Sequence, residues 1–490
     1  MTVLLDVGLG LAVAAYVLAT AVLIGLALHA AVLAALRLAH GPRALPEAEP
    51  PRGEAWPAVV VQVPVYDEPA SLVARALDAA VALDYPGRVE IQLLDDSPPA
   101  AQRANAALCA ARRSAGVRHL ARASRDGFKA GALAHGLAHT EAPLAAVFDV
   151  DFRPAPDTLA RLVPSLLADE GLAFVQALWA HPEADRTALG RAQAAVLDLH
   201  FAVEQAGRDR AGLPITFNGT AGVWRVAAIE AAGGWQGDTL AEDLDLALRA
   251  QTTGWRARLV EGVLVPADLP PTAGAWRQQQ ARWAKGLAEV GRKHLGRVWR
   301  SDLPVRSRLA ASMMPALSLS LPSLLLVVLL HPVVGAAQAV GWGPPALYAA
   351  LGAGYVALGG LVAAHAVAQR ALYPASWRRR LVGLPLVLAA PLALVAPAAR
   401  AVAEAARGRR SPFVRTSKRP GAPSEAATAE LALAAYSALG AVALAGLGAW
   451  GALVFQVVLV VALVGAAGVV RGDVLSEAAV DAPSVSRVAA

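Results

Sequence analysis

The sequence has 490 residues, 56% of them hydrophobic, and its mean hydropathy of +0.46 is too high for an ordinary soluble protein. Its formal charge of +6 comes with no basic stretch interleaved with base-stacking aromatic residues, so we expect no nucleic-acid partner. Loops that face anionic lipid headgroups explain the positive charge better. The single cysteine, Cys109, excludes an internal disulfide.

The first predicted element is a membrane-spanning helix. Residues 7–36 contain no Asp, Glu, Lys or Arg, and a hydrocarbon core is crossed by about 20 apolar residues. No basic segment precedes this run, and no clear small-residue cleavage site follows it. We therefore predict that residues 1–40 form a retained anchor rather than a cleaved signal.

A polar region, residues 50–270, is predicted to be an α/β domain. Apolar, β-rich runs at 58–66, 89–97, 142–151 and 171–178 alternate with helical stretches, which is typical of a doubly wound parallel sheet. Ligands bind beyond the carboxyl ends of such strands. Those ends carry acidic residues and no glycine-rich loop, which favours a metal–nucleotide site: Asp67, Glu68, Asp95, Asp96, Asp149 and Asp151.

Asp149-Val150-Asp151 is the first acidic motif with a specific chemistry. Alternate residues of an extended segment point the same way, so the two carboxylates are expected to converge. Mg²⁺ commonly takes one or two carboxylates together with substrate phosphates. A solvated turn is the alternative for so short a motif, but its position after an apolar strand favours a metal site.

A second acidic cluster lies in "TLAEDLDLALRA", residues 239–250. Glu242, Asp243 and Asp245 crowd the first turn of a predicted helix, where acids are favoured by the helix dipole. That explanation is sufficient for Asp245. It does not explain why the cluster follows "FNGTAGVW" (217–224), a stretch of small residues that can bring the backbone close to a substrate.

Lysine is scarce, because only four of the 44 basic residues are lysines: Lys129, Lys285, Lys293 and Lys418. Arg and Lys are not interchangeable at a tight site, so Lys129 in "DGFKAGAL" and Lys418 in "FVRTSK" are candidates for function. Lys285 and Lys293 are expected to be surface charges that face the lipid.

Residues 271–308 are predicted to form amphipathic helices at the membrane interface. Gln279, Arg282 and Trp283 share one helical face, where Arg282 suits a diphosphate and Trp283 offers a flat surface to a sugar ring. Trp276 and Trp299 are better explained as anchors at the membrane interface.

Five further apolar runs lie in the predicted membrane bundle, residues 309–475, which precedes a tail at 476–490: 309–335, 345–368, 381–399, 429–447 and 449–470. Arginines flank the membrane side of the α/β domain and predict that it is cytoplasmic. The run 381–399 has arginines at both ends and three prolines. We interpret it as interfacial or re-entrant; a kinked span, the alternative, would reverse the sidedness of everything after it.

Seven motifs occur in a fixed order: "VPVYDE", "LLDDS", "DGFKAGAL", "FDVDF", "FNGTAG", "AEDLDL" and "QQQARW". Over residues 58–290 the chain resembles the membrane-bound processive glycosyltransferases of family 2, including cellulose synthase and the mannan or glucomannan synthase-like enzymes. The resemblance implies a glycosyltransferase A-type domain inserted between transmembrane helices. It also implies a nucleotide-sugar donor, Mg²⁺ or Mn²⁺, inversion at the anomeric carbon, and export of a growing glycan through the lipid bilayer of the plasma (inner) membrane.

The resemblance assigns roles to the residues already named. Asp96, with Asp95, would read the nucleotide, and Lys129 would contact it. Asp149 and Asp151 would hold the metal on the diphosphate, and Asp243 would be the general base. The remaining assignments are the diphosphate contacts Gln279 and Arg282 and the acceptor-site residues Phe217, Asn218, Gly219 and Trp283. The family usually has threonine or another residue where this chain has Ala241, which leaves the role of Glu242 less defined.

Residues 408–420 resemble the gating loop of cellulose synthase, with Phe413, Thr416 and Lys418 in the spacing F-x-x-T-x-K. Such a loop would close over the nucleotide and exclude water. A basic cytoplasmic linker is the alternative. If the loop gates the site, it must be cytoplasmic, which agrees with an interfacial 381–399.

Two other functions fit the same residues less well. A non-processive enzyme would move one sugar to a lipid such as ceramide or a polyprenyl phosphate, and would need neither the complete Q-x-x-R-W motif nor a gating loop. A catalytically silent membrane scaffold would not need the acids. The sequence does not distinguish UDP-glucose from GDP-mannose as donor, and it predicts no oligomeric state.

Overall fold

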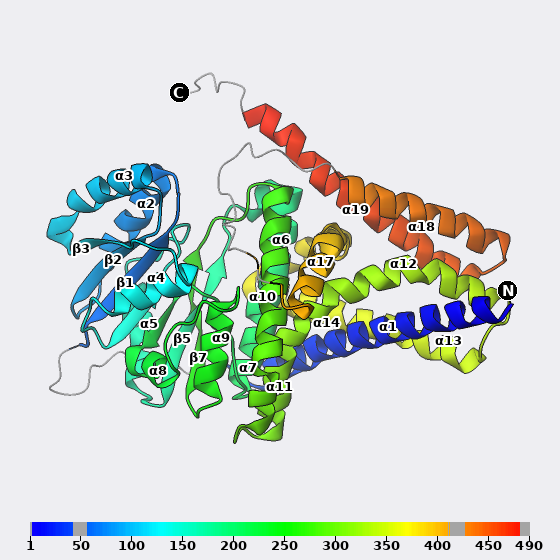
Figure 1. The fold of residues 1–490 in the computed structure, drawn as a ribbon, viewed down its shortest axis with the longest axis horizontal. Coiled ribbons are helices and arrows are strands. Elements are labelled where there is room, and N and C mark those ends of the chain that lie inside the picture. Colours follow the sequence, from blue (N-terminus) through cyan, green and yellow to red (C-terminus); the bar gives the residue numbers. More distant parts are fainter. Residues whose placement is uncertain (1, 43–55, 410, 412–426, 481–490) are drawn as a thin grey trace.

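The computed structural model describes residues 2–42, 56–409, 411 and 427–480. It consists of an α/β domain at one end and a bundle of long helices at the other, with helix α10 between them (Figure 1). Helix α1 (Thr2–Ala39) belongs to the bundle, so the α/β domain lies between the first and second long helices in the sequence.

A seven-stranded sheet forms the centre of the α/β domain, in the order β3-β2-β1-β4-β6-β5-β7. The strands are β1 (Val59–Val65), β2 (Val89–Asp95), β3 (Val117–Ala121), β4 (Leu144–Val147), β5 (Leu172–Ala180), β6 (Gly222–Arg225) and β7 (Arg256–Pro266). Only β6 runs antiparallel to its neighbours, β4 and β5. This mixed, mainly parallel sheet confirms the predicted fold class.

Helices cover both faces of the sheet (Figure 1). They are α2 (Ala70–Val81), α3 (Pro99–Ala110), α4 (Phe128–Leu137), α5 (Thr158–Leu167), α6 (Ala188–Leu199), α7 (Ala206–Arg210), α8 (Val226–Ala231) and α9 (Glu242–Gln251). A π-helical turn, η3 (His200–Gln205), joins α6 to α7, and two short 3-10 turns are η1 (Arg113–Ala115) and η2 (Ala184–Arg186).

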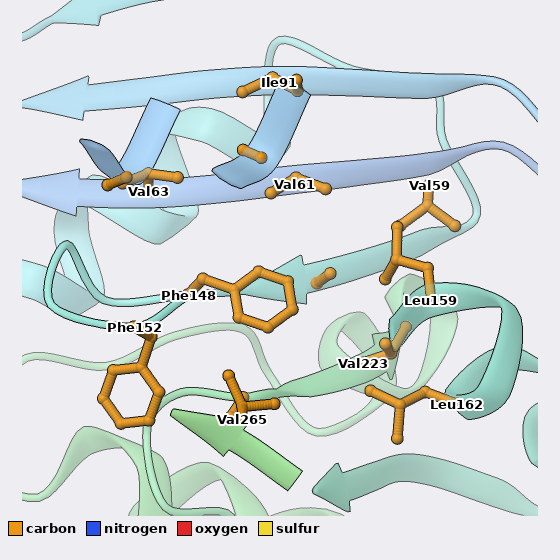
Figure 2. Packing of buried hydrophobic residues seen from close by; sticks show 14 of the residues in the cluster. Val59, Val61, Val63, Ile91, Phe148, Phe152, Leu159, Leu162, Val223 and Val265 are labelled. Carbon is orange, nitrogen blue, oxygen red and sulfur yellow. The ribbon is translucent and has the colours of Figure 1, made fainter. Parts of the chain in front are cut away.

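The apolar strand residues meet the helices in a closed core. Figure 2 shows Val61 and Val63 of β1 near Phe148, and Leu159 and Leu162 of α5 against the other strands. Leu159 and Leu162 are completely buried, and truncating such a leucine to alanine typically costs about 2–5 kcal/mol. This core fixes the carboxyl ends of the strands, where the predicted site lies.

Helix α10 (Ala273–Arg300) links the α/β domain to the bundle. Its N-terminus is capped by Thr272, whose hydroxyl accepts a hydrogen bond from the Ala275 amide at 3.2 Å. After α10, the chain continues through α11 (Val305–Ala316) and the 3-10 turn η4 (Leu317–Leu319) into the bundle.

Within the described residues, six helical segments are long and apolar enough to cross a membrane: 6–39, 305–339, 345–372, 377–406, 428–446 and 450–470. The bundle helices are α12 (Ser320–Ala339), α13 (Pro345–Leu351), α14 (Ala353–Leu372), α18 (Thr428–Gly446) and α19 (Trp450–Val480), together with α1. These segments indicate a multi-pass membrane protein.

The fourth segment, 377–406, is broken into short pieces. These are α15 (Trp377–Arg380), η5 (Leu381–Gly383), α16 (Leu384–Ala389), η6 (Ala390–Leu394) and α17 (Val395–Ala406). Pro385, Pro391 and Pro397 each lie in the first turn of a piece, where proline's missing N–H is not needed. The prolines therefore lie where the segment is divided into its short pieces.

Three strands were not predicted from the sequence. β3 is a short edge strand that contains Arg118 and His119, and β6 has only four residues. β7 contains Arg256, Arg258 and Glu261, so its apolar pattern is interrupted. Pairing with neighbouring strands, rather than local hydrophobicity, defines these three elements.

Candidate active site

A cavity of about 610 Å³ lies at the carboxyl ends of the central strands. At one end it is lined by Tyr66, Asp96 and Lys129, and at the other by residues of α11, η4 and α12, including Met314 and Leu321. Ligand sites in open α/β sheets occupy this position. The cavity therefore extends from the sheet to the first helix of the bundle that follows the domain.

Asp149 and Asp151 both line this cavity. The sequence predicts that these two acids lie on an extended strand, but β4 ends at Val147. The Phe152 amide then donates a hydrogen bond to the Asp149 carbonyl at 2.9 Å. The two acids thus reach the cavity from a turn. The Asp149 amide donates to the Thr220 hydroxyl at 2.8 Å, which fixes the turn against the loop before β6.

Lys129 lies at the start of α4, next to the same turn. Its Nζ is 2.5 Å from Asp149 Oδ1 and donates to the Gly219 carbonyl at 3.0 Å. Burial opposes its charged form, but Asp149, Glu242 and Asp243 outweigh this and raise the pKa of Lys129. One ammonium therefore bonds to Asp149 and lies close enough to Glu242 and Asp243 to interact with their charges.

Glu242 and Asp243 form the first turn of α9 and line the cavity. Burial, reinforced by the neighbouring Glu242 carboxylate, raises the pKa of Asp243 to about 7. Burial also raises the pKa of Glu242, against the opposing effect of Lys129. A carboxylate with a pKa near neutrality is suited to accept and release a proton at physiological pH.

Gly219 makes the close approach of the 217–224 loop possible. Its φ is +77°, a left-handed conformation that favours glycine, and a Cβ there would lie 2.9 Å from Asp243 Oδ2. Any side chain would therefore push against the Asp243 carboxylate. This agrees with the expectation that the small residues allow backbone close to the reacting groups.

Helix α10 packs against the segment that leads into α9. A Cβ on Gly286 would lie 2.9 Å from the Ala241 amide nitrogen, so only glycine allows this spacing. Glu289 accepts a hydrogen bond from the Leu240 amide at 2.8 Å. The helix that carries Gln279, Arg282 and Trp283 is thus held directly against Glu242 and Asp243.

The sequence interpretation explains Asp245 by the helix dipole alone, and the structure corrects this. Asp245 is fully buried and pairs with Arg249, Lys293 and His294 at 2.7, 2.7 and 2.5 Å. Burial opposes the charge of Asp245, but His294, Lys293 and Arg249 outweigh it and lower its pKa to about 2. Asp245 therefore joins α9 to α10.

Gln279, Arg282 and Trp283 all line the cavity, as their helical spacing predicted. Burial lowers the pKa of Arg282, although the nearby Glu242, Asp243 and Asp149 act in the opposite direction. Arg282 thus lies close enough to the acids to interact with their charges. It lines the space where a diphosphate would be held.

Three predictions for the surface of α10 were wrong. Lys285 is buried and bonds to Glu404 of α17 at 3.1 Å, and Lys293 pairs with Asp238 at 2.6 Å and with Asp245, so neither is a free surface charge. Trp276 is buried in a cluster with residues of α6 and η6. Trp299 is exposed, as a membrane anchor requires.

Asp95 and Asp96 separate into different roles. Asp95 is buried beside β2, where it accepts hydrogen bonds from the Ser97 amide at 2.9 Å and from Asn105 at 3.0 Å. It is absent from the residues that line the cavity, which corrects its assignment as a nucleotide contact. Asp96 does line the cavity, and Arg122 holds both of its oxygens, at 2.8 and 2.5 Å.

The residues predicted for the acceptor site differ in how the structure places them. Phe217 reaches the cavity wall, but its ring is buried against Phe174 and Trp224, so it mainly supports the loop. Asn218 lines the cavity and bonds to His200 and Gln205. Phe413, Thr416 and Lys418, the predicted gating residues, lie outside the described residues.

The cavity acids fit a divalent cation only in part. Among residues 2–42, 56–409, 411 and 427–480, no group of three or more His, Cys, Asp or Glu side chains could enclose a metal ion. Asp149 and Asp151 still supply the one or two carboxylates that Mg²⁺ or Mn²⁺ needs when substrate phosphates complete its shell. The residues present therefore fit a cation that binds with a nucleotide diphosphate.

Two family models match the chain: "Glycosyl transferase family 2" over residues 60–230 and "Glycosyl transferase family group 2" over residues 146–361. Glucomannan 4-β-mannosyltransferase 1 of Oryza sativa subsp. japonica is 38% identical over 265 residues, covering 52% of this chain and 51% of that protein. Glucomannan 4-β-mannosyltransferase 2 of Arabidopsis thaliana is 40% identical over 245 residues, covering 49% and 46%. Together the two models span residues 60–361, so the chain contains a family 2 glycosyltransferase domain.

Residues 60–361, which the two models match, include the sheet from β1 to β7. The chain spans about half the length of the curated relatives it matches. A solved structure, the mannosyltransferase PcManGT from Pyrobaculum calidifontis in complex with GDP-Man and Mn²⁺, superposes with a TM-score of 0.53 at 22% identity. The superposition covers 74% of this chain and 99% of that one, and it shows the shared fold.

Several residues in or beside the glycosyltransferase cavity were missed from the sequence. Arg122 holds Asp96, and Arg125 lies over the Tyr66 ring at 3.2 Å from its centroid. His200 and Glu204 line the cavity from the π-helical turn. A histidine and a glutamate four residues apart inside an apolar helical stretch are the one signal that could have identified this turn, since buried polar groups need partners.

Proposed function

We propose that the chain transfers a hexose from a nucleotide sugar to the end of a growing β-linked glycan and passes the product toward the membrane helices. The observation that carries the proposal is the single cavity that joins Asp149, Asp151 and Asp243 to α11, η4 and α12. An enzyme that released each product to solvent would have no need of a wall that continues into the bundle.

Mannose is the sugar that we propose, with GDP-mannose as its donor and UDP-glucose as the alternative. The relatives at about 40% identity are named as glucomannan mannosyltransferases. Their similarity extends over 245–265 residues, and this supports the same class of substrate here.

In the proposed mechanism, Asp243 removes the proton from the acceptor hydroxyl as that oxygen attacks C1 of the sugar. The nucleoside diphosphate leaves from the opposite face, so the configuration at C1 inverts. Arg282 and Lys129 supply positive charge next to the acids, where negative charge develops on the diphosphate. Asp149 and Asp151 would hold Mg²⁺ or Mn²⁺, which would neutralise the leaving diphosphate when bound.

We also propose that the α/β domain is cytoplasmic and that the chain lies in the plasma (inner) membrane. The arginines beside the domain, at 37, 43, 52, 297 and 300, follow the excess of positive charge in cytoplasmic loops. A cytoplasmic domain would meet its nucleotide sugar directly and would send the glycan outward.

Membranes that contain the protein would test the function. Incubation with labelled GDP-mannose, and separately with UDP-glucose, should give a polymer that an endo-β-mannanase or an endo-β-glucanase, respectively, degrades. EDTA should abolish incorporation, and Mn²⁺ or Mg²⁺ should restore it. A product of one sugar on an extractable lipid would replace the proposal with single transfer, and full activity in EDTA would remove the metal.

A further inference from the structure

The π-helical turn η3 forms part of the cavity wall that the proposed mechanism does not use. His200, Glu204 and Gln205 of this turn line the cavity, together with Asn218. π-helical turns are rare and occur frequently at functional sites. This one lies between α6 and α7, on the side of the cavity that faces the bundle.

The hydrogen bonds of this wall fix the direction of every donor. Gln205 Nε2 donates to Asn218 Oδ1 at 2.8 Å, so the Asn218 amide nitrogen points to His200 Nε2 at 2.7 Å. Asn218 donates this bond, which makes Nε2 the acceptor of the ring. The proton of His200 is therefore on Nδ1, and it is donated to Glu204 Oε2 at 2.8 Å.

A buried arginine anchors the wall to the bundle. Arg208 donates to the Ala310 carbonyl of α11 at 2.7 Å and to His29 Nε2 of α1 at 2.9 Å. Burial disfavours the charge of Glu204, but the hydrogen bond from His200 and the charge of Arg208 outweigh it and lower the pKa of Glu204. Glu204 is therefore an ionised carboxylate at the membrane end of the cavity.

The wall retains hydrogen-bonding capacity on both sides of His200. The bond from His200 uses one carboxylate oxygen of Glu204 and leaves the other as an acceptor. The bond to His200 uses one of the two amide hydrogens of Asn218 and leaves the other as a donor. Nearby, the ring of Trp179 lines the cavity and packs against Phe201 at 5.1 Å between centroids.

A sugar hydroxyl both donates and accepts, and a pyranose ring presents an apolar face that packs on an aromatic side chain. We propose that His200, Glu204 and Asn218 form an acceptor subsite for the sugars that precede the reacting one. In this subsite Glu204 and Asn218 bind hydroxyls directly, and His200 positions both. The inference rests on the proposed function, and it adds the residues that hold the glycan between the acids and the bundle.

The residues that would read the nucleotide lie on other elements than this wall. Tyr66 and Asp96 line the cavity beside β1 and β2, where Arg122 holds Asp96. Changes in the wall should therefore alter the use of the acceptor without altering the binding of the donor. Transfer of the sugar to water, which needs no acceptor subsite, should also persist.

The test uses the full-length protein in detergent, with GDP-mannose as donor and β-1,4-mannopentaose as added acceptor. Glu204→Gln keeps an oxygen for His200 but removes the charge, so we expect KM for mannopentaose to rise about tenfold or more. KM for GDP-mannose and the rate of its hydrolysis should stay within about twofold of wild type. His200→Ala should raise KM for mannopentaose in the same way.

Asp198→Asn is the matched control, because Asp198 lies on the preceding turn but bonds away from the cavity, to Gln369 at 2.9 Å and Tyr373 at 3.3 Å. Asp198→Asn should leave the ratio of KM for mannopentaose to KM for GDP-mannose unchanged. An unchanged KM for mannopentaose in Glu204→Gln would overturn the subsite. So would an equal loss of donor hydrolysis, since that marks a structural role. A wild type that makes polymer but does not use added mannopentaose would also overturn the subsite, whereas a wild type that makes no polymer at all would show that the proposed function itself fails.

Discussion

At the scale of single residues, the site depends on how three acids and one lysine share a small buried volume. Lys129 bonds to Asp149 and to the Gly219 carbonyl, while Gly219 itself leaves no room for a Cβ beside Asp243. Burial disfavours the charged forms of Asp243 and Glu242, and neighbouring carboxylates add to this effect, so the pKa of each of the two rises. The lysine keeps the cluster from losing its charge entirely.

Asp243→Asn should abolish the proposed base while keeping the shape of the site. We expect transfer to fall by at least about a hundredfold, because general base catalysis contributes roughly 10²–10⁴-fold. Binding of GDP, measured by calorimetry, should change little. The control is Asp238→Asn, which alters a half-exposed acid that pairs with Lys293 outside the cavity. Normal turnover by Asp243→Asn would show that another group takes the proton.

The pH dependence of kcat/KM should also report Asp243. A base must be deprotonated to act, so activity should rise with pH around the pKa of about 7. Since the Glu242 carboxylate is one cause of that raised pKa, Glu242→Gln should move the rise to lower pH. A profile that stays flat from pH 5 to pH 8, or that shifts upward in Glu242→Gln, would contradict this assignment.

At the scale of elements, the joint between α9 and α10 brings two distant motifs together. α9 begins with Glu242 and Asp243, and α10 carries Gln279, Arg282 and Trp283. Gly286 allows the close packing, and Asp245 binds Lys293 and His294 across the joint. The acidic motif and the Q-x-x-R-W motif are thus parts of one rigid arrangement.

Asp245→Asn should therefore destabilise the protein, although Asp245 lies outside the cavity. Removing one partner of a buried ion cluster typically costs about 3–5 kcal/mol. The lowered pKa of Asp245 means that its contribution is complete above about pH 4 and is lost as pH falls toward about 2. Thermal unfolding at pH 7 should show a lower Tm than wild type. An unchanged Tm with lost transfer would instead give Asp245 a direct role in catalysis.

At the scale of the molecule, the sequence was sufficient for the fold class and for most cavity residues, because ordered motifs and apolar periods are local signals. It was insufficient wherever a residue's partner lies far along the chain. Lys285 and Lys293 are predicted from the sequence to be surface charges, but in the folded chain they pair with Glu404 and Asp245, respectively. Asp95 and Asp96 are adjacent, and only the folded strand end shows that the first is turned into the core. His200 and Glu204 carried no motif at all.

The broken segment 377–406 determines the sidedness of the C-terminal half. Its two ends contact the same side of the molecule: Arg380 pairs with Asp185 of the α/β domain at 2.9 Å, and Glu404 pairs with Lys285 of α10 at 3.1 Å. A segment that crossed the bilayer would place its ends about 30 Å or more apart, on opposite surfaces. These two ion pairs favour an interfacial or re-entrant segment over a kinked span.

We therefore predict that residues 400–425 are cytoplasmic. In a Cys109→Ser background, a cysteine at the exposed position Arg409 should resist a membrane-impermeant thiol reagent in intact cells and react after permeabilisation. Leu447→Cys, between α18 and α19, should react in intact cells, because α18 begins beside α10 and ends at the far side of the bundle (Figure 1). Ready labelling of Arg409→Cys from outside would make 377–406 a true span and would place residues 408–420 too far from the cavity to gate it.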